Sequence, residues 1–210
     1  MERIDRKAHW EGVYATKAPA EVSWYQARPA RSLELLAEAG VTATSAVIDV
    51  GGGDSTLVDA LLERGTERVT VLDLSGAALA RARARLGARA TGVTWIEADV
   101  TSAVLPPGAY DAWHDRAVFH FLTEADDRRR YAEAAASAVR AGGALVIATF
   151  APDGPTRCSA LDVVRYDAES LAREFAPQFA LVRGLVETHV TPWGAEQRFT
   201  YVILRRRESQ

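Results

Sequence analysis

The chain has 210 residues, of which 48% are hydrophobic and 25% are charged, and its formal net charge is −3. This is an ordinary globular composition, and the small negative charge argues against nucleic acid as a partner. The single cysteine excludes internal disulfide bonds, and no stretch approaches the roughly 20 apolar residues of a membrane-spanning helix. Because no apolar signal core follows the first charged residues, we expect a cytoplasmic protein without a membrane partner.

The first 30 residues are unusually rich in aromatic side chains. They contain Trp10, Tyr14, Trp24 and Tyr25. Aromatic residues more often pack than bind, so one interpretation is a short helix packed on the core. The other is a cover over a ligand, in which an aromatic face meets a cation. Gly12 and Pro19 interrupt the segment and predict two short pieces, followed by a helix from Arg28 to Gly40.

The motif around which the chain is organised comes next. An apolar run, residues 47–50, leads into Gly51, Gly52 and Gly53, and residues 56–64 have the pattern of an amphipathic helix. Glycines permit a positive φ and let a ligand approach the main chain, and a helix N-terminus offers free N–H groups. A nicotinamide-dinucleotide fingerprint requires glycine at the sixth position, where Thr56 stands. A plain turn without a ligand is the remaining alternative.

Acidic residues fall at the ends of three predicted strands. Asp49 precedes the glycines, Asp73 ends the strand 69–74, and Asp99 follows the apolar run of the strand 93–100. The carboxyl ends of parallel strands meet at one edge of a sheet, where open α/β folds bind ligands. A carboxylate at the second position can accept hydrogen bonds from a ribose hydroxyl pair.

Asp49-x-Gly51-x-Gly53, then Asp73, then Asp99-Val100 resembles the class I S-adenosylmethionine-dependent methyltransferases. In that family the glycine loop holds the methionine part of the cofactor, the second acid holds the ribose and the third polar position recognises adenine. The resemblance implies S-adenosyl-L-methionine as cofactor and S-adenosyl-L-homocysteine as product. The cofactor-binding positions that it implies here are Asp49, Gly51, Gly52, Gly53, Asp73, Leu74, Asp99, Val100, Asp115, Tyr14 and Trp24.

The order of the elements also fits this family. The further strands are expected at 110–115, 144–150, 179–190 and 196–204. The resemblance therefore implies a doubly wound, Rossmann-like α/β fold with a seven-stranded sheet, mostly parallel, that ends in an antiparallel strand pair. We expect one domain over residues 1–210, with residues 1–40 as a helical cover and residues 45–204 as the core.

The N-terminal aromatic residues extend the resemblance to one branch of the superfamily. Trp10 and Tyr14, followed by Trp24 and Tyr25, look like the citrate synthase and elongation-factor lysine methyltransferases. This short match does not carry the substrate over. In the cover hypothesis Tyr14 lies near the cofactor, while Trp24 or Tyr25 borders the methyl acceptor.

Candidate catalytic residues follow from the strand 110–115, whose end faces the transferred methyl group in the resembled family. Methyl transfer from a sulfonium mainly needs positioning and desolvation, and a base only when the nucleophile is protonated. His120 is either that base or a packed, orienting residue. Arg116 either anchors an anionic substrate or pairs with Asp115 or Asp126, and Asp115 holds a substrate or the methionine amino group.

The sequence also bears on three further partners, namely nucleic acid, metal ions and a second subunit. The arginines between the second and third strands have no interleaved aromatic residues and are interpreted as a solvated face. His9 and His189 form no metal-ligand spacing, so we expect no metal. The chain is expected to be a monomer or a homodimer.

Three functions remain: a methyltransferase acting on a small molecule, a protein lysine methyltransferase, and a non-catalytic adenosyl-binding protein. A closed aromatic pocket would favour a small-molecule acceptor, and an open acidic groove would favour a peptide. Production of adenosylhomocysteine would exclude the third function.

Overall fold

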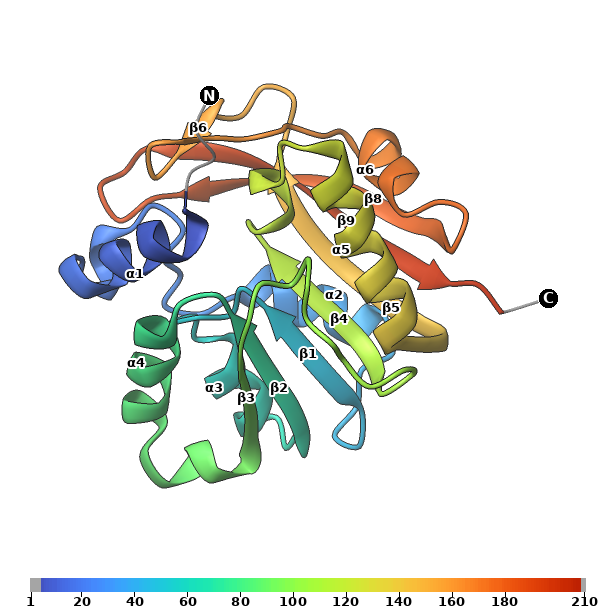
Figure 1. Cartoon of the computed structure of the whole chain (residues 1–210), viewed down its shortest axis with the longest axis horizontal. Helices are drawn as coiled ribbons and strands as arrows, with labels where there is room; N and C mark the ends of the chain where they lie inside the picture. The colour runs from blue at the N-terminus through green and yellow to red at the C-terminus, as the bar shows by residue number, and fades with distance from the viewer. Residues whose placement is uncertain (1–4, 209–210) are drawn as a thin grey trace.

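A seven-stranded sheet forms the centre of the molecule, which we describe from a computed structural model (Figure 1). The structure describes residues 5–208, so residues 1–4 and 209–210 of the predicted domain lie outside the described part. The strand order is β3-β2-β1-β4-β5-β9-β8. The strands are β1 (Ala46–Val50), β2 (Arg68–Asp73), β3 (Val93–Glu97), β4 (Tyr110–Arg116), β5 (Val139–Phe150), β8 (Phe179–Val190) and β9 (Glu196–Arg206).

The predicted fold class is confirmed. Strands β1 to β5 pair in parallel, β9 runs antiparallel to β5, and β8 runs antiparallel to β9. Each parallel connection passes through a helix or a long crossover, as parallel pairing requires. A separate two-residue ladder joins β6 (Arg157–Cys158) to β7 (Leu161–Asp162) in the loop after β5.

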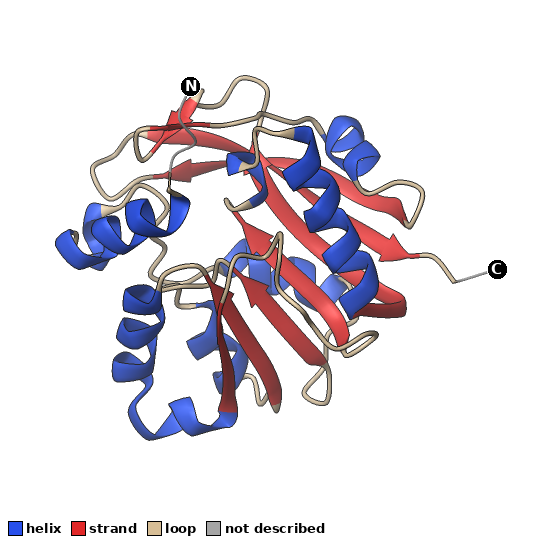
Figure 2. Ribbon diagram, viewed as in Figure 1, coloured by secondary structure: helices blue, strands red, loops and turns tan. Residues whose placement is uncertain are grey.

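Helices cover both faces of the sheet (Figure 2). The α-helices are α1 (Arg6–Thr16), α2 (Ala30–Glu38), α3 (Leu57–Glu63), α4 (Gly76–Leu86), α5 (Ala125–Ala138) and α6 (Ala168–Glu174). Short 3₁₀ turns are η1 (Pro19–Glu21), η2 (Gly87–Gly92) and η3 (Phe119–Phe121).

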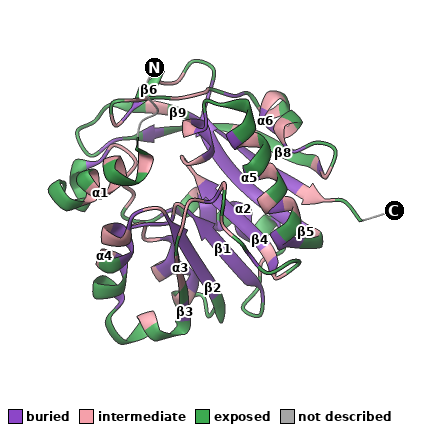
Figure 3. Cartoon of the chain, in the orientation of Figure 1, coloured by how far each residue is buried: buried purple, intermediate pink, exposed green. Residues whose placement is uncertain are grey.

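Alternate residues of the strands supply two separate cores. In β1, Val47 joins the core formed with α2, α3 and α4, whereas Ile48 and Val50 join the core formed with α5 and α6. All five residues of β1 are buried, and all except Asp49 are apolar, as expected for a strand that is covered on both faces. The central strand β1 is therefore buried on both sides, whereas the edge strand β8 is largely exposed and so are the outer faces of the helices (Figure 3).

Three boundaries differ from the sequence-based expectation. Gly12 does not interrupt the N-terminal segment, because α1 runs through it. The helix expected to begin at Arg28 begins only at Ala30, after Pro29. The sequence also predicts a long helix that runs to Arg140, before Gly142 and Gly143, whereas α5 ends at Ala138, since the main chain of the next residue already pairs with β4.

Among the helices of the described chain, none combines the length and the apolar character needed to cross a bilayer.

Candidate functional site

The glycine turn after β1 has a conformation and surroundings that only glycine fits. Gly51 and Gly53 have positive φ values of 65° and 35°. A Cβ atom on Gly51 would overlap the side chain of Val118, and one on Gly53 would lie 2.7 Å from an Asp73 oxygen and 3.2 Å from the Tyr14 hydroxyl. The turn therefore lies directly against the ends of β2 and β4.

Asp49 and Gly52 meet on the inner side of this turn. A Cβ atom on Gly52 would lie 2.5 Å from Asp49 Oδ2, an oxygen that is buried and has no hydrogen-bond partner. Asp49 Oδ1 and His114 Nδ1 share a hydrogen bond of 2.7 Å, and the other ring nitrogen of His114 shares one of 2.8 Å with the Ser32 hydroxyl. These contacts hold the carboxylate of Asp49 with one free oxygen beside the glycine turn.

Asp73 lies at the end of β2 with an environment suited to titration near neutrality. Its Oδ1 accepts a hydrogen bond from the Ser75 N–H at 2.8 Å. Burial raises the pKa of the Asp73 carboxyl to about 7, against the lowering effect of the Ser75 hydrogen bond. The carboxyl lies close to Gly53 of the glycine turn and lines the first of the cavities described below.

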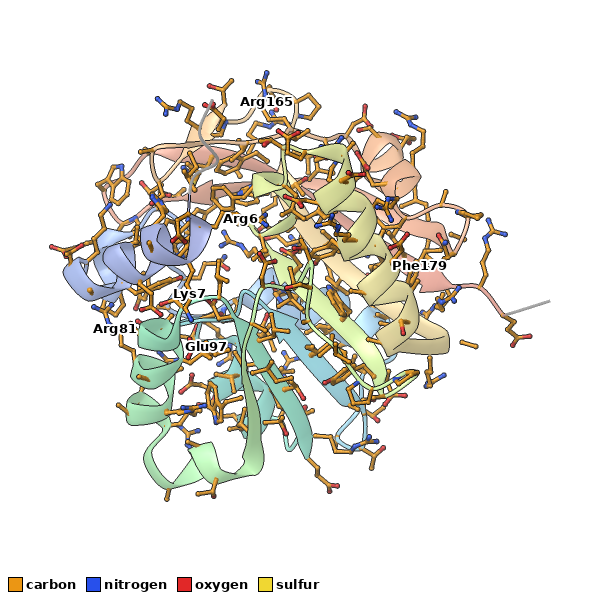
Figure 4. All side chains as sticks on the ribbon, viewed as in Figure 1. Arg6, Lys7, Arg81, Glu97, Arg165 and Phe179 are labelled. Carbon is orange, nitrogen blue, oxygen red and sulfur yellow. The ribbon has the colours of Figure 1, made fainter. Side chains whose placement is uncertain are left out.

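Asp99 is tied to the N-terminal helix. Its Oδ2 accepts a hydrogen bond from the Arg6 guanidinium at 3.0 Å, and its Oδ1 accepts bonds from the Thr101 N–H and hydroxyl. Lys7 and Glu97 form a second ion pair between α1 and the end of β3, at 2.6 Å (Figure 4). These contacts attach α1 to the carboxyl end of the third strand.

Glu11 adds a third attachment of α1, this time to α4. Its carboxylate accepts hydrogen bonds from the N–H groups of Gly76 at 2.6 Å and Ala77 at 3.3 Å. Free N–H groups in the first turn of a helix favour a negative charge, so the contact also complements the helix dipole. The N-terminal helix is thus fixed across the sheet edge by ion pairs with acids at the end of β3 and by hydrogen bonds from the first N–H groups of α4.

Two neighbouring cavities open at this edge. The empty space within the first is about 790 Å³ and within the second about 680 Å³, and both figures include the part that is open to solvent. Of the predicted cofactor positions, the first cavity is lined by Tyr14, Trp24, Gly51, Asp73, Leu74, Asp99 and Val100. The second is lined by Tyr14, Trp24, Asp49, Gly51 and Gly52.

Aromatic rings from the N-terminal segment form one wall of the first cavity. The Trp10 ring lies 5.7 Å from that of Trp24 and 5.1 Å from that of Phe121, measured between centroids, and both pairs meet edge to face. Tyr14 and Trp24 pack at 6.5 Å. Cys158, buried in the loop after β5, also lines this cavity.

Arg116 borders both cavities at the end of β4. Its Nε donates to the Tyr201 hydroxyl at 3.1 Å, its Nη1 donates to the Trp24 carbonyl at 2.9 Å, and its guanidinium lies over the Phe199 ring. Its Nη2 is buried and has no hydrogen-bond partner. No ion pair of Arg116 with an acid occurs within residues 5–208, so pairing with Asp115 is not observed.

Asp115 lies away from both cavities. The fully buried carboxylate accepts hydrogen bonds from the N–H groups of Val118 and Phe119 and from the Tyr131 hydroxyl at 2.5 Å. Burial raises the pKa of Asp115 to about 6. With its oxygens already bonded, Asp115 shapes the turn after β4, and this geometry does not favour the predicted contacts with substrate or cofactor.

His120 also lies outside the lining of both cavities. Its Nδ1 accepts a hydrogen bond from the Phe150 N–H at 3.3 Å, and its ring packs against Phe121 and Phe150. Burial lowers the pKa of His120 to about 3, with a smaller contribution from Arg116. The acceptor nitrogen is occupied, so the geometry favours the packed, orienting interpretation. Catalysis by His120 stays a prediction.

Sequence reasoning missed several residues that the fold brings to the site. Arg6, Val118 and Phe121 line the first cavity, and Ser32 bonds to His114, which in turn bonds to Asp49. Arg6 and Ser32 meet their partners across 93 and 82 residues, so no local spacing pattern marks them. Over the described residues, no group of three or more His, Cys, Asp or Glu side chains is placed to hold a metal ion.

Comparisons with known proteins agree with this geometry. Residues 47–143 match the family model described as a methyltransferase domain. Uncharacterized methyltransferases of Mycobacterium tuberculosis and Mycobacterium bovis are 36% identical over 107 residues, which is 51% of this chain and 51% of each relative. The chain thus matches these curated relatives over about half of their length.

Solved structures extend the similarity to nearly the whole chain. One from a study of the conversion of a disulfide bond into a thioacetal in echinomycin biosynthesis has a TM-score of 0.76 at 23% identity, over 97% of this chain and 93% of that one. The 1,6-didemethyltoxoflavin-N1-methyltransferase of Burkholderia thailandensis has a TM-score of 0.71 at 21% identity, over 96% and 87%. The N-methyltransferase NodS of Bradyrhizobium japonicum has a TM-score of 0.75 at 15% identity, over 97% and 100%. These similarities concern the fold.

Proposed function

We propose that this chain is a class I S-adenosylmethionine-dependent methyltransferase that transfers the cofactor's methyl group to a small molecule, because residues 47–143 match the methyltransferase domain model and the fold is shared with S-adenosylmethionine-dependent enzymes. The observation that carries the proposal is the cavity at the strand ends, with cofactor-type acids on one side and aromatic rings on the other.

In this proposal, the strand ends hold the adenosine part of the cofactor. Asp73 accepts hydrogen bonds from the ribose hydroxyls and Asp99 takes part in adenine recognition, with Leu74 and Val100 as apolar walls. Gly51 and its neighbours leave the main chain open to the methionine part. The free Asp49 oxygen in the second cavity is placed to accept a hydrogen bond from a cationic group such as the methionine ammonium.

The acceptor would lie in the aromatic part of the first cavity. The acids that line this cavity are Asp73 and Asp99, both at the cofactor strand ends. A lysine side chain entering the aromatic part would meet the guanidinium of Arg116 and no carboxylate. This charge distribution disfavours the lysine alternative, whereas a neutral or anionic small molecule is compatible with it.

The names of two structural neighbours agree with a small acceptor. The Burkholderia enzyme is described with 1,6-didemethyltoxoflavin and S-adenosylhomocysteine bound together, and NodS is described as an N-methyltransferase in complex with S-adenosylhomocysteine. At these identities the acceptor itself does not transfer to this chain.

The chemistry requires little of the protein beyond placement. The sulfonium methyl is already activated, so the aromatic cover and the strand ends contribute by excluding water and by aligning the acceptor for in-line displacement. A nucleophile whose attacking atom is already deprotonated needs no base, which is consistent with the buried positions of Asp115 and His120.

The test uses the cofactor labelled in its methyl group. The protein is incubated with labelled S-adenosylmethionine and a cell extract, and the label is counted in the protein precipitate and in the small-molecule fraction. We expect label in the small-molecule fraction together with S-adenosylhomocysteine. Label confined to protein would establish the lysine alternative, and binding without any S-adenosylhomocysteine would establish the non-catalytic one.

A further inference from the structure

Arg116 carries a positive charge into the interior without a matching acid. Its Nη2 is shielded from solvent and unbonded, and no ion pair of this guanidinium occurs within the described part of the chain. Burial lowers the pKa of His120 and of His189, and the positive charge of Arg116 lowers both further. A buried charged group with an unsatisfied N–H is costly unless an anionic partner binds to it.

The position of the guanidinium is fixed by three groups from two distant segments. The Tyr201 hydroxyl on β9 and the Trp24 carbonyl in the N-terminal segment accept hydrogen bonds from the guanidinium. The Phe199 ring, also on β9, lies against its face, with its centroid 4.6 Å from Arg116 Cζ. The remaining N–H therefore has a set direction. Such pre-organised arginines bind carboxylates well because little rotational freedom is lost.

The space beside Arg116 has walls suited to a flat apolar ring. Trp10, Trp24 and Phe121 line the first cavity together with Arg116, and the three rings meet edge to face. Aromatic ligands pack well against such rings, both offset and edge to face. The cavity thus combines an aromatic wall with one pre-organised cation.

We propose that the methyl acceptor is a small aromatic acid, whose carboxylate binds the free N–H of Arg116 while its ring packs against the wall formed by Trp10, Trp24 and Phe121. This inference rests on the proposed function and names the substrate class of the same site. The cofactor's own methionine carboxylate offers the same chemistry and borders the same residue, so the experiment separates the two sources.

The experiment measures binding of a matched probe pair to protein saturated with S-adenosylhomocysteine. The probes are 2-naphthoate and 2-naphthamide, which share one ring system and differ in charge. Binding is followed by calorimetry and by the fluorescence of the cavity tryptophans. We expect the carboxylate to bind at least about tenfold more tightly than the amide, as a charge-assisted bond to a buried arginine implies. Equal affinities, or no binding of naphthoate, would overturn the proposal.

Variants then identify Arg116 as the origin of the preference. In Arg116→Met the preference for naphthoate is lost, and in Arg116→Lys it is reduced, while both keep their affinity for S-adenosylhomocysteine. The control is Arg157→Met, which removes an exposed arginine paired with Asp162 on the loop that carries Cys158. A preference that survives in both Arg116 variants contradicts the proposal, and the lysine variant keeps the test usable if the methionine variant does not fold.

A second ligand separates acceptor from cofactor. 5′-Methylthioadenosine lacks the amino acid part of S-adenosylhomocysteine. If Arg116→Met weakens S-adenosylhomocysteine but not methylthioadenosine, Arg116 binds the cofactor's carboxylate and the proposal is wrong. If the native protein fails to bind S-adenosylhomocysteine at all, it is the proposed function that fails.

Discussion

On the β1–β2–β3 side of the site, each functional group comes from a short local motif, whereas on the β4–β5–β9 side the groups come from segments far apart in the chain. Gly51 and Asp73 follow their own strands directly. Arg116, by contrast, is positioned by Tyr201 and Trp24, which are 85 and 92 residues away. The proposed cofactor half can therefore be identified from the sequence, whereas the proposed acceptor half is assembled only by the fold.

The first prediction concerns the N-terminal segment, which belongs to the assembled half. Removing residues 1–28 takes away Trp10, Tyr14 and Trp24, and with them the aromatic wall and one partner of Arg116. We expect methyl transfer to fall by about a hundredfold or more, because positioning and exclusion of water are lost. Cofactor binding should weaken too.

The melting curve of the shortened chain decides between the two interpretations of this segment. A cooperative melt with lost activity supports a cover. A lost cooperative melt means that the segment is a permanent part of the core. A shortened chain that folds, binds and turns over normally would contradict both.

The second prediction concerns the local half. Asp73→Ala removes the acceptor of the ribose hydroxyl bonds, each worth roughly 1.5–3 kcal/mol when charge-assisted. Titration calorimetry should show S-adenosylhomocysteine binding at least about tenfold more weakly, with the fold retained. Unchanged affinity would remove Asp73 from the site.

The third prediction follows from the pKa of Asp73, which burial raises from 3.8 to about 7. The ionised carboxylate accepts both ribose hydroxyl bonds, so the affinity for S-adenosylhomocysteine should rise severalfold as the pH increases through about 7. The effect of pH on folding stability has the opposite sign. The contribution of Asp73 to stability is fully present below pH 3.8 and is lost as the pH rises through about 7. Affinities measured between pH 6 and 8 (about one unit either side of the pKa) check this, and Asp73→Asn should flatten the profile.

The smallest expected effect concerns the attachment of α1. Arg6→Met breaks the partly exposed pair with Asp99, and we expect S-adenosylhomocysteine to dissociate about two- to threefold faster, since such pairs are weak. The matched control is Lys7→Met, which breaks the more exposed pair with Glu97 outside the cavity lining. Slower dissociation from the Arg6 variant would mean that Arg6 competes with the cofactor for Asp99.

The sequence predicted the sheet and the placement of the glycine turn and strand-end acids because these depend on local periodicity and spacing. It could not predict the pair of Arg6 and Asp99, which are 93 residues apart. It also could not tell that Asp115 and His120, close in sequence to Arg116, turn into the interior. Which side of the sheet edge a side chain faces depends on the turn after β4, and that turn is held by tertiary hydrogen bonds.

The most direct test of this account is a crystal structure of the protein with S-adenosylhomocysteine bound. The account predicts the ribose hydroxyls within hydrogen-bond distance of Asp73, the homocysteine part along Gly51 to Gly53, and no contact between the cofactor and Nη2 of Arg116. A cofactor carboxylate bound to Arg116, or an adenosine moiety placed away from Asp73, would contradict the division of the site into a cofactor half and an acceptor half.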